Sequence, residues 1–405
     1  LETIGSHKSI LLETLFYIYG ARFISYLAIK YSSDDVIRWV RAEPSESYQG
    51  ILAKFEDIFK VDFNKAWQNF INYEITFQNS NIDLIKQNEL TNLKRISGET
   101  FGWVTQPYFD RFSNEVLFGY HRSHELAELQ SFKLTNGKST LLSSLPTPSM
   151  IQVASTAFDE GAGLYFFTTN NNQLFRDIWA IDVNSGDKKL LFENCRVGDL
   201  TISPIKRDLW GVRVQSGIKT LVISPYPYNE LIPVFSFDVS EDIFQLSIDT
   251  KGEKLAAVLH KANGLQSIIV ADANKLINSE KFEYVTISNN GSPENPSWSF
   301  DGNFLYWNAF TNGVSNIYRF DINNNSVKAI TNCVTGLFKP IEISEDSLFA
   351  FEYSTDGFTP VMFLNKPAEY LAAINYLGQN IIEKNPEVVQ WVLPDASTVI
   401  NPMEY

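Results

Sequence analysis

The sequence has little of what a metal site or a membrane-spanning helix requires. It contains four histidines and two cysteines in 405 residues. The cysteines, Cys195 and Cys333, lie 138 positions apart, which matches no zinc-binding spacing. They form either one disulfide or two isolated buried thiols. No run of 18 apolar residues occurs, so the sequence predicts no helix that spans a membrane.

Positive charge is also scarce. Lys and Arg total 33 against 47 Asp and Glu, which gives a formal net charge of −14. A nucleic-acid-binding protein needs a basic face to neutralise phosphates, and no run of Lys and Arg supplies one. We therefore expect no nucleic-acid partner. The 44% hydrophobic and 14% aromatic content is ample for folded cores, and the length suggests two or three domains.

Residues 1–92 are predicted to form an α-helical segment. Gly20 lies inside the first helix, where we expect it to allow close packing, because Gly there costs about 1 kcal/mol relative to Ala. Ser32 to Asp35 is a predicted cap for a second, short helix. The buried stripe of the first helix is predicted to contain Leu11, Leu15, Ile18, Phe23 and Leu27. A third helical stretch is predicted to bury Phe55, Ile58, Phe59, Phe63, Trp67, Phe70 and Ile71.

Residues 95–365 contain a repeat, which indicates a repeated structural unit. In its clearest copy the turn Asn295–Gly302 precedes three predicted strands, which contain Phe304–Trp307, Ile317–Asp321 and Val327–Thr331. With a fourth strand shared across the junction, this pattern describes one blade of a β-propeller.

The same pattern recurs six times along the chain. Its copies are anchored at Asp110, Asp159, Pro204, Asp249, Asp301 and Glu345, at intervals of 49, 45, 45, 52 and 44 residues. Six units of this period fit a closed ring, and closure removes the strand edges that would otherwise aggregate. We therefore predict a mainly β protein, a six-bladed β-propeller with an N-terminal α-helical segment. The anchoring Asp residues are expected to cap their own turns, without a catalytic or calcium-binding role.

The unit Asn295–Thr331 resembles the propeller repeat of the TolB family, which reads approximately PSWSPDG…IY-x-x-D…LT. Phe300 stands where the family usually has Pro, and the other blades keep only parts of the motif. The resemblance covers about two-thirds of the chain. It implies a periplasmic propeller that presents a face to a protein or peptide partner, although fold alone does not fix function.

The front of the chain resembles a second family. Residues 17–27, with Tyr31 beyond, are similar to the helix that follows the active site in gluzincin-type zinc peptidases; Ser32 stands where that family has Gly. The resemblance implies that residues 1–92 are the C-terminal part of a peptidase-like domain. The zinc-binding H-E-x-x-H motif would then lie upstream of Leu1. Tyr17 and Tyr19 become candidate donors to a developing oxyanion, the alternative being tyrosines packed in a core.

Residues 366–405 are predicted to be a C-terminal extension or linker. Pro386–Pro394 and Asn401–Tyr405 resemble the linker that follows the propeller in relatives that continue into an outer-membrane β-barrel. Since the chain also begins at Leu1, we expect it to be a piece of a longer parent protein.

Other catalytic motifs are incomplete. His124–Glu128 opens like H-E-x-x-H, but its fifth residue is Glu128, so a zinc-binding pair is broken. His121 and His124 either bind a metal or, as we expect, belong to a solvated loop. No G-x-S-x-G occurs, which argues against a serine hydrolase of the α/β type.

These observations favour a non-catalytic protein- or peptide-binding propeller in a larger exported bacterial protein, periplasmic or associated with the outer membrane. We expect no cofactor and no metal in this chain. The alternative is a part of an active zinc metallopeptidase, whose zinc site would be upstream in the full-length parent. A third possibility is a scaffold in envelope assembly.

Overall fold

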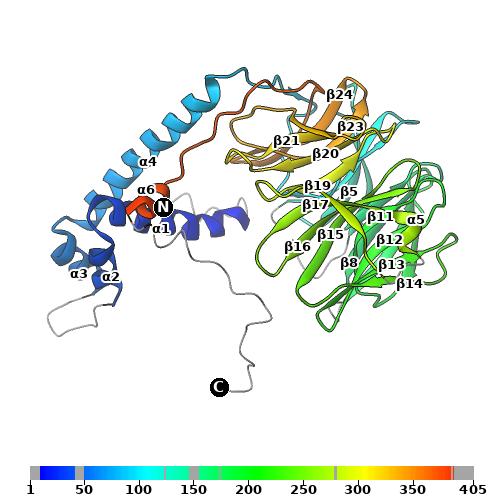
Figure 1. Cartoon of the computed structure of the whole chain (residues 1–405), viewed down its shortest axis with the longest axis horizontal. Helices are drawn as coiled ribbons and strands as arrows, with labels where there is room; N and C mark the ends of the chain where they lie inside the picture. Colours follow the sequence, from blue (N-terminus) through cyan, green and yellow to red (C-terminus); the bar gives the residue numbers. More distant parts are fainter. Residues whose placement is uncertain are drawn as a thin grey trace. The chain divides into compact units, whose positions relative to one another are not determined.

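The chain folds into two compact units, and Figure 1 labels many of their helices and strands. One unit consists of residues 10–87 and 372–384, and the other of residues 88–371. The computed structural model describes residues 10–41, 50–122, 125–145, 155–171, 173, 175–277, 281–384 and 386.

The larger unit is a six-bladed β-propeller. Within the described residues, five antiparallel sheets have four strands and one has five. The first three blades contain β2 (Trp103–Val104), β3 (Tyr108–Asp110), β4 (Glu115–His121), β5 (Ala127–Lys133) and β6 (Ser139–Leu145); β7 (Thr156–Asp159), β8 (Leu164–Asn170), β9 (Arg176–Asp182) and β10 (Lys188–Phe192); and β11 (Val197–Ile202), β12 (Leu209–Gln215), β13 (Ile218–Ser224) and β14 (Ile232–Ser236). The other three contain β15 (Glu241–Ile248), β16 (Lys254–Lys261), β17 (Gln266–Asp272) and β18 (Tyr284–Ser288); β19 (Glu294–Trp298), β20 (Phe304–Ala309), β21 (Asn316–Asp321) and β22 (Ser326–Ala329); and β23 (Leu337–Ser344), β24 (Ser347–Ser354), β25 (Gly357–Leu364) and β1 (Lys94–Arg95). The predicted fold class is confirmed.

The turns that anchor the blades have the predicted local cause. Asp110 accepts a hydrogen bond from the backbone N–H of Phe112, two residues on. Asp159, Asp249 and Asp301 likewise accept from backbone N–H groups of their own turns. An Asp side chain that satisfies nearby backbone donors stabilises such a turn, so the expected turn-capping role is confirmed.

The ring is closed by a strand from the beginning of the propeller. β1 pairs with β25, with Lys94 opposite Met362, and the backbones of Phe101 and Phe358 exchange two hydrogen bonds. The prediction that the fifth blade shares its fourth strand is wrong, because β19 to β22 all lie within that blade. β19 occupies part of the predicted turn. The pair Asn295–Pro296 is typical of a turn sequence, and Asn295 has a left-handed backbone, but both residues lie within the strand.

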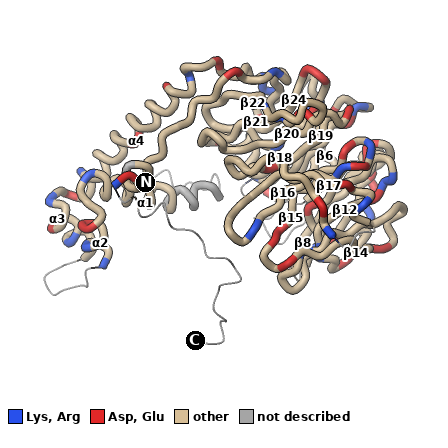
Figure 2. Tube along the Cα trace, in the orientation of Figure 1, with Lys and Arg blue, Asp and Glu red and all other residues tan. Residues whose placement is uncertain are grey.

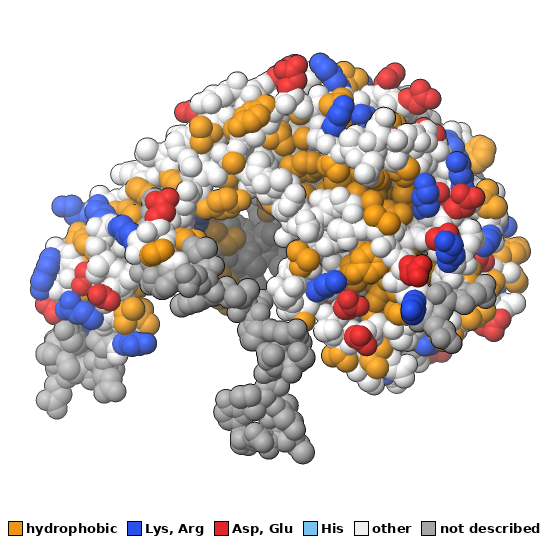
Figure 3. All heavy atoms as spheres, in the orientation of Figure 1, with side chains coloured by type: hydrophobic (Ala, Val, Ile, Leu, Met, Phe, Trp, Pro, Cys, Tyr) orange, Lys and Arg blue, Asp and Glu red, His pale blue; other side chains and the backbone are white. Residues whose placement is uncertain are grey.

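Aromatic side chains fill the interfaces between blades. Phe118 of the first blade meets Phe351 of the last at 5.0 Å between ring centroids, in an edge-to-face arrangement that aromatic pairs prefer. Trp307, which is 1% exposed, packs in a cluster with Val258 and Ile268 of the fourth blade. The surface also keeps hydrophobic side chains among its charged ones (Figure 3). On the side shown in Figure 2, the described cationic and anionic residues of the propeller are intermingled.

The smaller unit is helical. Its core includes Phe23, Trp39, Phe55 and Phe70, which are all buried. Ser32 accepts a hydrogen bond from the N–H of Asp35, which confirms the predicted cap of the second helix. The helices are α1 (Ile10–Lys30), α2 (Ser33–Arg41), α3 (Ile51–Phe59), α4 (Phe63–Lys86) and α6 (Gln379–Lys384), while the short α5 (Ala273–Leu276) belongs to the propeller.

Three details of the helical prediction are wrong. Ile18 is 51% exposed and therefore lies off the buried stripe. Gly20 has open space where a Cβ would stand, so close packing does not explain it. The third stretch is two helices, α3 and α4, because Lys60 adopts a left-handed conformation and Asp62 caps the helix that follows.

Both cysteines are free thiols, so the alternative of a disulfide between them is wrong. Cys195 donates to the carbonyl of Arg176, and Cys333 to that of Ser315. No helix in the described part of the chain combines the length and the apolar character that a membrane crossing demands.

Candidate functional site

Two pockets lie at the axis of the propeller, where the innermost strands converge. The first has a volume of about 490 Å³ and receives residues from all six blades; because of its side chains we name it the polar pocket. The second, which we name the opposite pocket, has a volume of about 450 Å³. Gln106, Tyr108, Leu246 and Pro296 line both, so the pockets adjoin along the axis.

Four successive inner strands carry the same irregularity beside the polar pocket. Asp199, Gln245, Asn295 and Lys339 adopt left-handed φ values of 50°, 51°, 55° and 57°. In each case the strand register shifts at that residue, as in a β-bulge. A non-glycine residue pays roughly 1–2 kcal/mol for this conformation, and bulges redirect side chains near functional sites. The repeated strain therefore marks this pocket as a functional-site candidate.

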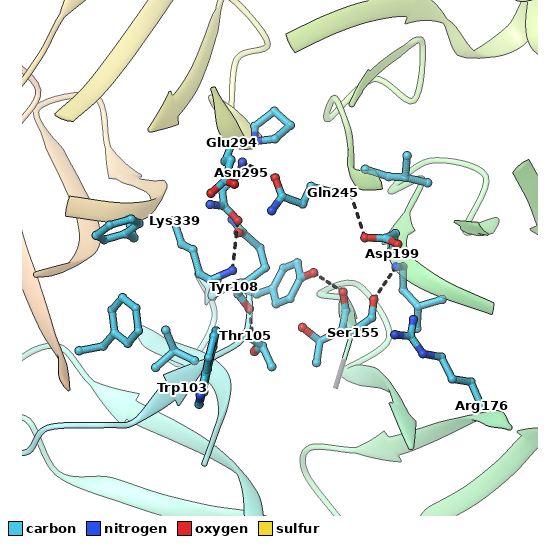
Figure 4. A pocket seen from close by; sticks show the side chains of 18 residues that line it. Trp103, Thr105, Tyr108, Ser155, Arg176, Asp199, Gln245, Glu294, Asn295 and Lys339 are labelled. Carbon is cyan, nitrogen blue, oxygen red and sulfur yellow. Dashed lines mark hydrogen bonds between the residues drawn. The ribbon is translucent and has the colours of Figure 1, made fainter. Parts of the chain in front are cut away.

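The four bulge residues are joined from blade to blade by hydrogen bonds (Figure 4). The N–H of Gln245 donates to Asp199 Oδ1 at 3.0 Å, and the N–H of Asn295 donates to Gln245 Oε1 at 2.7 Å. Lys339 Nζ then donates to Asn295 Oδ1 at 3.1 Å. We name these four residues the bulge ladder. It begins at a carboxylate on the third blade and ends at an ammonium on the sixth, on the other side of the ring.

Four charged side chains line the polar pocket: Arg176, Asp199, Glu294 and Lys339. In the described part of the chain, none of them forms an ion pair within 4.0 Å, although 12 such pairs occur elsewhere. Burial lowers the pKa of Lys339 to about 8, against the opposing effect of Glu294 and Asp199. Burial raises the pKa of Asp199. These charges are thus held apart and poorly compensated, which favours a ligand that can supply the missing partners.

A glycine makes room for one of the cations. A Cβ at Gly198 would lie 1.9 Å from Nη1 of Arg176, so any larger residue would displace that guanidinium. The other side of the pocket is aromatic, with Trp103, Phe338 and Phe358 contributed by the first and last blades. Charged and apolar walls therefore face one cavity.

The opposite pocket differs because three of the four charged side chains that line it, all except Glu342, are in ion pairs. Arg111 forms an ion pair with Glu160, and Arg207 with Asp159. Glu342 accepts a hydrogen bond from the N–H of Phe300 at 2.6 Å, and burial raises its pKa. The side chains left at this mouth for a partner are apolar, with Phe112 82% and Ile205 71% exposed.

The sequence-predicted catalytic candidates line neither pocket. Tyr17 and Tyr19 belong to α1 of the helical unit and are 80% and 39% exposed. The structure does not bring them to a reacting group among the described residues, and their role stays a prediction. Ala127 and Glu128 lie in β5, where Glu128 accepts from the hydroxyl of Tyr120.

The structure describes only part of the histidine segment. The expectation of a solvated loop is wrong for His121, which is 5% exposed at the end of β4, where burial lowers its pKa. His124 lies outside the described residues. Among the residues that are described, no group of three or more His, Cys, Asp or Glu side chains could hold a metal ion. The gluzincin resemblance places its zinc site upstream of Leu1, so these residues do not bear on it.

The bulge ladder was missed by sequence reasoning, although it left a signal. Its members are spaced by 46, 50 and 44 residues, close to the blade period. Each is a long or polar residue followed by Leu or Pro, a few positions before a blade anchor. They precede the anchors by 5, 4, 6 and 6 residues, so an alignment on the anchors brings them close together without placing them in one column.

No protein-family model matches the sequence, and no curated protein matches it. Many solved structures are similar in fold. A protein described as TolB from Agrobacterium tumefaciens is 14% identical, with a TM-score of 0.45, over 54% of this chain and 75% of that one. TolB from Acinetobacter baumannii is 15% identical, with a TM-score of 0.43, over 60% and 61%.

A calcium-binding protein, regucalcin from Agrobacterium tumefaciens, is 12% identical, with a TM-score of 0.50, over 71% of this chain and 98% of that chain. Identities this low show the fold alone. The chain is thus a β-propeller with TolB-like structural neighbours, and its function has to be argued from its own pockets.

Proposed function

We propose that the propeller is a non-catalytic binding module that holds a segment of a protein or peptide in its polar pocket. The observation that carries this proposal is the set of four charged side chains that line one cavity without an ion-pair partner there. A peptide offers both hydrogen-bond donors and acceptors at short spacing, so it can compensate cations and carboxylates together.

The dimensions and the walls of the pocket support a ligand of this class. Its volume of about 490 Å³ is within the roughly 300–1,000 Å³ typical of ligand pockets. Trp103 is 40% exposed at the aromatic wall, where it can cover apolar side chains of a bound segment.

The proposal is tested by filling the cavity. Gln106 lines both pockets, so Gln106→Trp should place an indole on the axis and abolish peptide binding. Leu141→Trp is the matched control, because Leu141 is 52% exposed on the outer strand β6 of the same blade. Binding of a mixed pool of neutral tripeptides would be followed by saturation-transfer NMR. Retained binding by Gln106→Trp, or no binding by the unaltered chain, would contradict the proposal.

We also propose that the chain belongs to an exported protein of the periplasm or the outer membrane. The resemblance of its repeat to TolB supports this location, which cell fractionation of the parent protein would test. The alternative function, as part of a zinc metallopeptidase, has one favouring observation: Tyr17 and Tyr19 are exposed on α1 and available to a neighbouring segment. Stoichiometric zinc and peptidase activity in the full-length parent would support it, if Tyr17→Phe or Tyr19→Phe loses the peptidase activity and keeps the zinc.

A further inference from the structure

We infer that Lys339 binds the α-carboxylate of a peptide C-terminus that enters the polar pocket along the propeller axis. This inference rests on the proposed function and names the end of the peptide that is recognised. Lys339 is the last member of the bulge ladder. The side chains of the other three members accept hydrogen bonds, whereas the Lys339 ammonium donates one.

The ammonium group of Lys339 has unused hydrogen-bonding capacity. It carries three N–H donors, and its one described acceptor is Asn295 Oδ1 at 3.1 Å. No carboxylate of the described residues lies within ion-pair distance of it, although Glu294 and Asp199 line the same cavity. A ligand carboxylate would supply the charge-assisted bonds that the protein itself does not provide.

The surrounding groups hold Lys339 in place without neutralising it. Its backbone N–H donates to Asn308 Oδ1 at 3.2 Å, and Asn308 also accepts from Asn295 Nδ2 at 2.8 Å. Asn308 is fully buried, so this amide fixes the bulge from behind. The charged or titratable groups that line the cavity with Lys339 are Tyr108, Arg176, Asp199 and Glu294.

The shape of the site favours the end of a chain over its middle. Six blades surround the polar pocket, and the inner strands β7, β11, β15, β19, β23 and β3 contact one another in that order. The Tyr108 hydroxyl donates to the Thr156 carbonyl between the first and second blades. Among the described residues these contacts leave the axis as the route for a ligand, and a chain end needs less room there than an internal segment, which has to continue in both directions. Of the two peptide ends, only the C-terminus carries the carboxylate that the Lys339 ammonium lacks.

A carboxylate bound there should also change the protonation of Lys339. Burial holds its pKa at about 8, so near pH 8 a fraction of the molecules lacks the proton. A neighbouring negative charge favours the ammonium form, and binding at pH 8 should therefore take up protons. This linkage distinguishes a direct contact from a purely structural role for the lysine, because a lysine that only supports the fold would not change its protonation with the ligand.

The experiment compares tripeptides Ala-Xaa-Ala, with Xaa neutral, that end in a free carboxylate with the same tripeptides ending in an amide. Saturation-transfer NMR identifies the bound tripeptides, and calorimetry at pH 8 in two buffers of different ionisation enthalpy measures affinity and proton uptake. Lys339→Met should weaken binding of the free-carboxylate form by about tenfold or more. Lys251→Met is the control, because Lys251 is an exposed lysine outside the polar pocket.

A second variant keeps the test decisive if Lys339→Met does not fold. Lys339→Arg retains the cation but does not titrate near pH 8, so it should keep most of the affinity and lose the proton uptake. Equal binding of the carboxylate and amide forms would overturn the assignment and leave peptide binding intact. No binding of either form would overturn the proposed function as well. Acetate that binds as tightly as the tripeptides would overturn the peptide end as the ligand.

Discussion

Replacing Arg207 by Met should destabilise the propeller more than replacing its ion-pair partner, Asp159, by Asn. Arg207 Nε donates to Asp159 Oδ2 at 2.7 Å and links the third blade to the second. The two side chains differ in burial, since that of Asp159 is 3% exposed and that of Arg207 is 32% exposed. Removing the cation leaves a buried carboxylate without its partner, whereas removing the carboxylate leaves a guanidinium that water can reach.

The expected magnitudes follow from this asymmetry. Breaking a fully buried pair costs about 3–5 kcal/mol, and because Arg207 is partly exposed we expect about 2–3 kcal/mol for Arg207→Met. Asp159→Asn keeps an oxygen that can accept from the N–H of Ala162, and Arg207 keeps its position 4.2 Å from the ring of Tyr226. We expect about 1 kcal/mol for that change.

Thermal unfolding of both variants, followed by circular dichroism at pH 7, measures the difference. One kcal/mol shifts the Tm of a domain of this order of size by roughly 2–4 °C, so Arg207→Met should lower the Tm by about twice as much as Asp159→Asn or more. Lys275→Met is the control, because the Lys275–Asp272 pair is 77% and 47% exposed and should contribute little. Equal shifts, or a larger shift for Asp159→Asn, would refute the argument from burial.

Three further predictions concern the closure of the ring, pH and the thiols. Gly357→Ala should lower the Tm much more than Gly186→Ala, because its Cβ would lie 2.2 Å from the carbonyl oxygen of Phe101, whereas Gly186 has open space and only its positive φ is strained; equal shifts would contradict this. Burial raises the pKa of Glu342, so its contribution to stability is present below the unfolded pKa and is lost as the pH rises through the folded pKa. Glu342→Gln should therefore gain Tm relative to the unaltered chain between pH 4 and pH 7, and a constant difference would count against it. Burial raises the pKa of Cys333 to about 12, so mass spectrometry after alkylation at pH 8 should find the less buried Cys195 modified first; the reverse order would be inconsistent with the fold.

The fold was predictable because its signal is repeated and local. Asp110, Asp159, Asp249 and Asp301 cap turns within a few residues of themselves, so each copy of the motif carries its own evidence. A ring of six such units then follows from closure. The strand that completes the ring, β1, was not predictable in the same way, since its pairing partner β25 is more than 250 positions away.

The polar pocket was not predictable from motifs, because its residues become neighbours only in the ring. Asp199, Asn295 and Lys339 share no residue type, and what they share is a backbone conformation that shifts the strand register. Asn295 and Pro296 were therefore interpreted as a turn, although they lie in β19. The interpretation of Tyr17 and Tyr19 as catalytic residues came from family resemblance. Neither residue lines a pocket of the propeller, so the pockets do not bear on that interpretation.

The contrast between the two pockets is itself an argument about function. At the opposite pocket the fold pairs three of the four charged lining side chains, through Arg111–Glu160 and Arg207–Asp159, and only Glu342 has no ion-pair partner among the described residues. Each pairing adds stability or offsets a desolvation loss. At the polar pocket four strained residues cost roughly 1–2 kcal/mol each, and the charges that line it stay without ion-pair partners. A protein stable by only about 5–15 kcal/mol gains nothing in stability from such an arrangement. The concentration of strained residues and unpaired charges at one end of the axis is best explained by a ligand that supplies the missing partners.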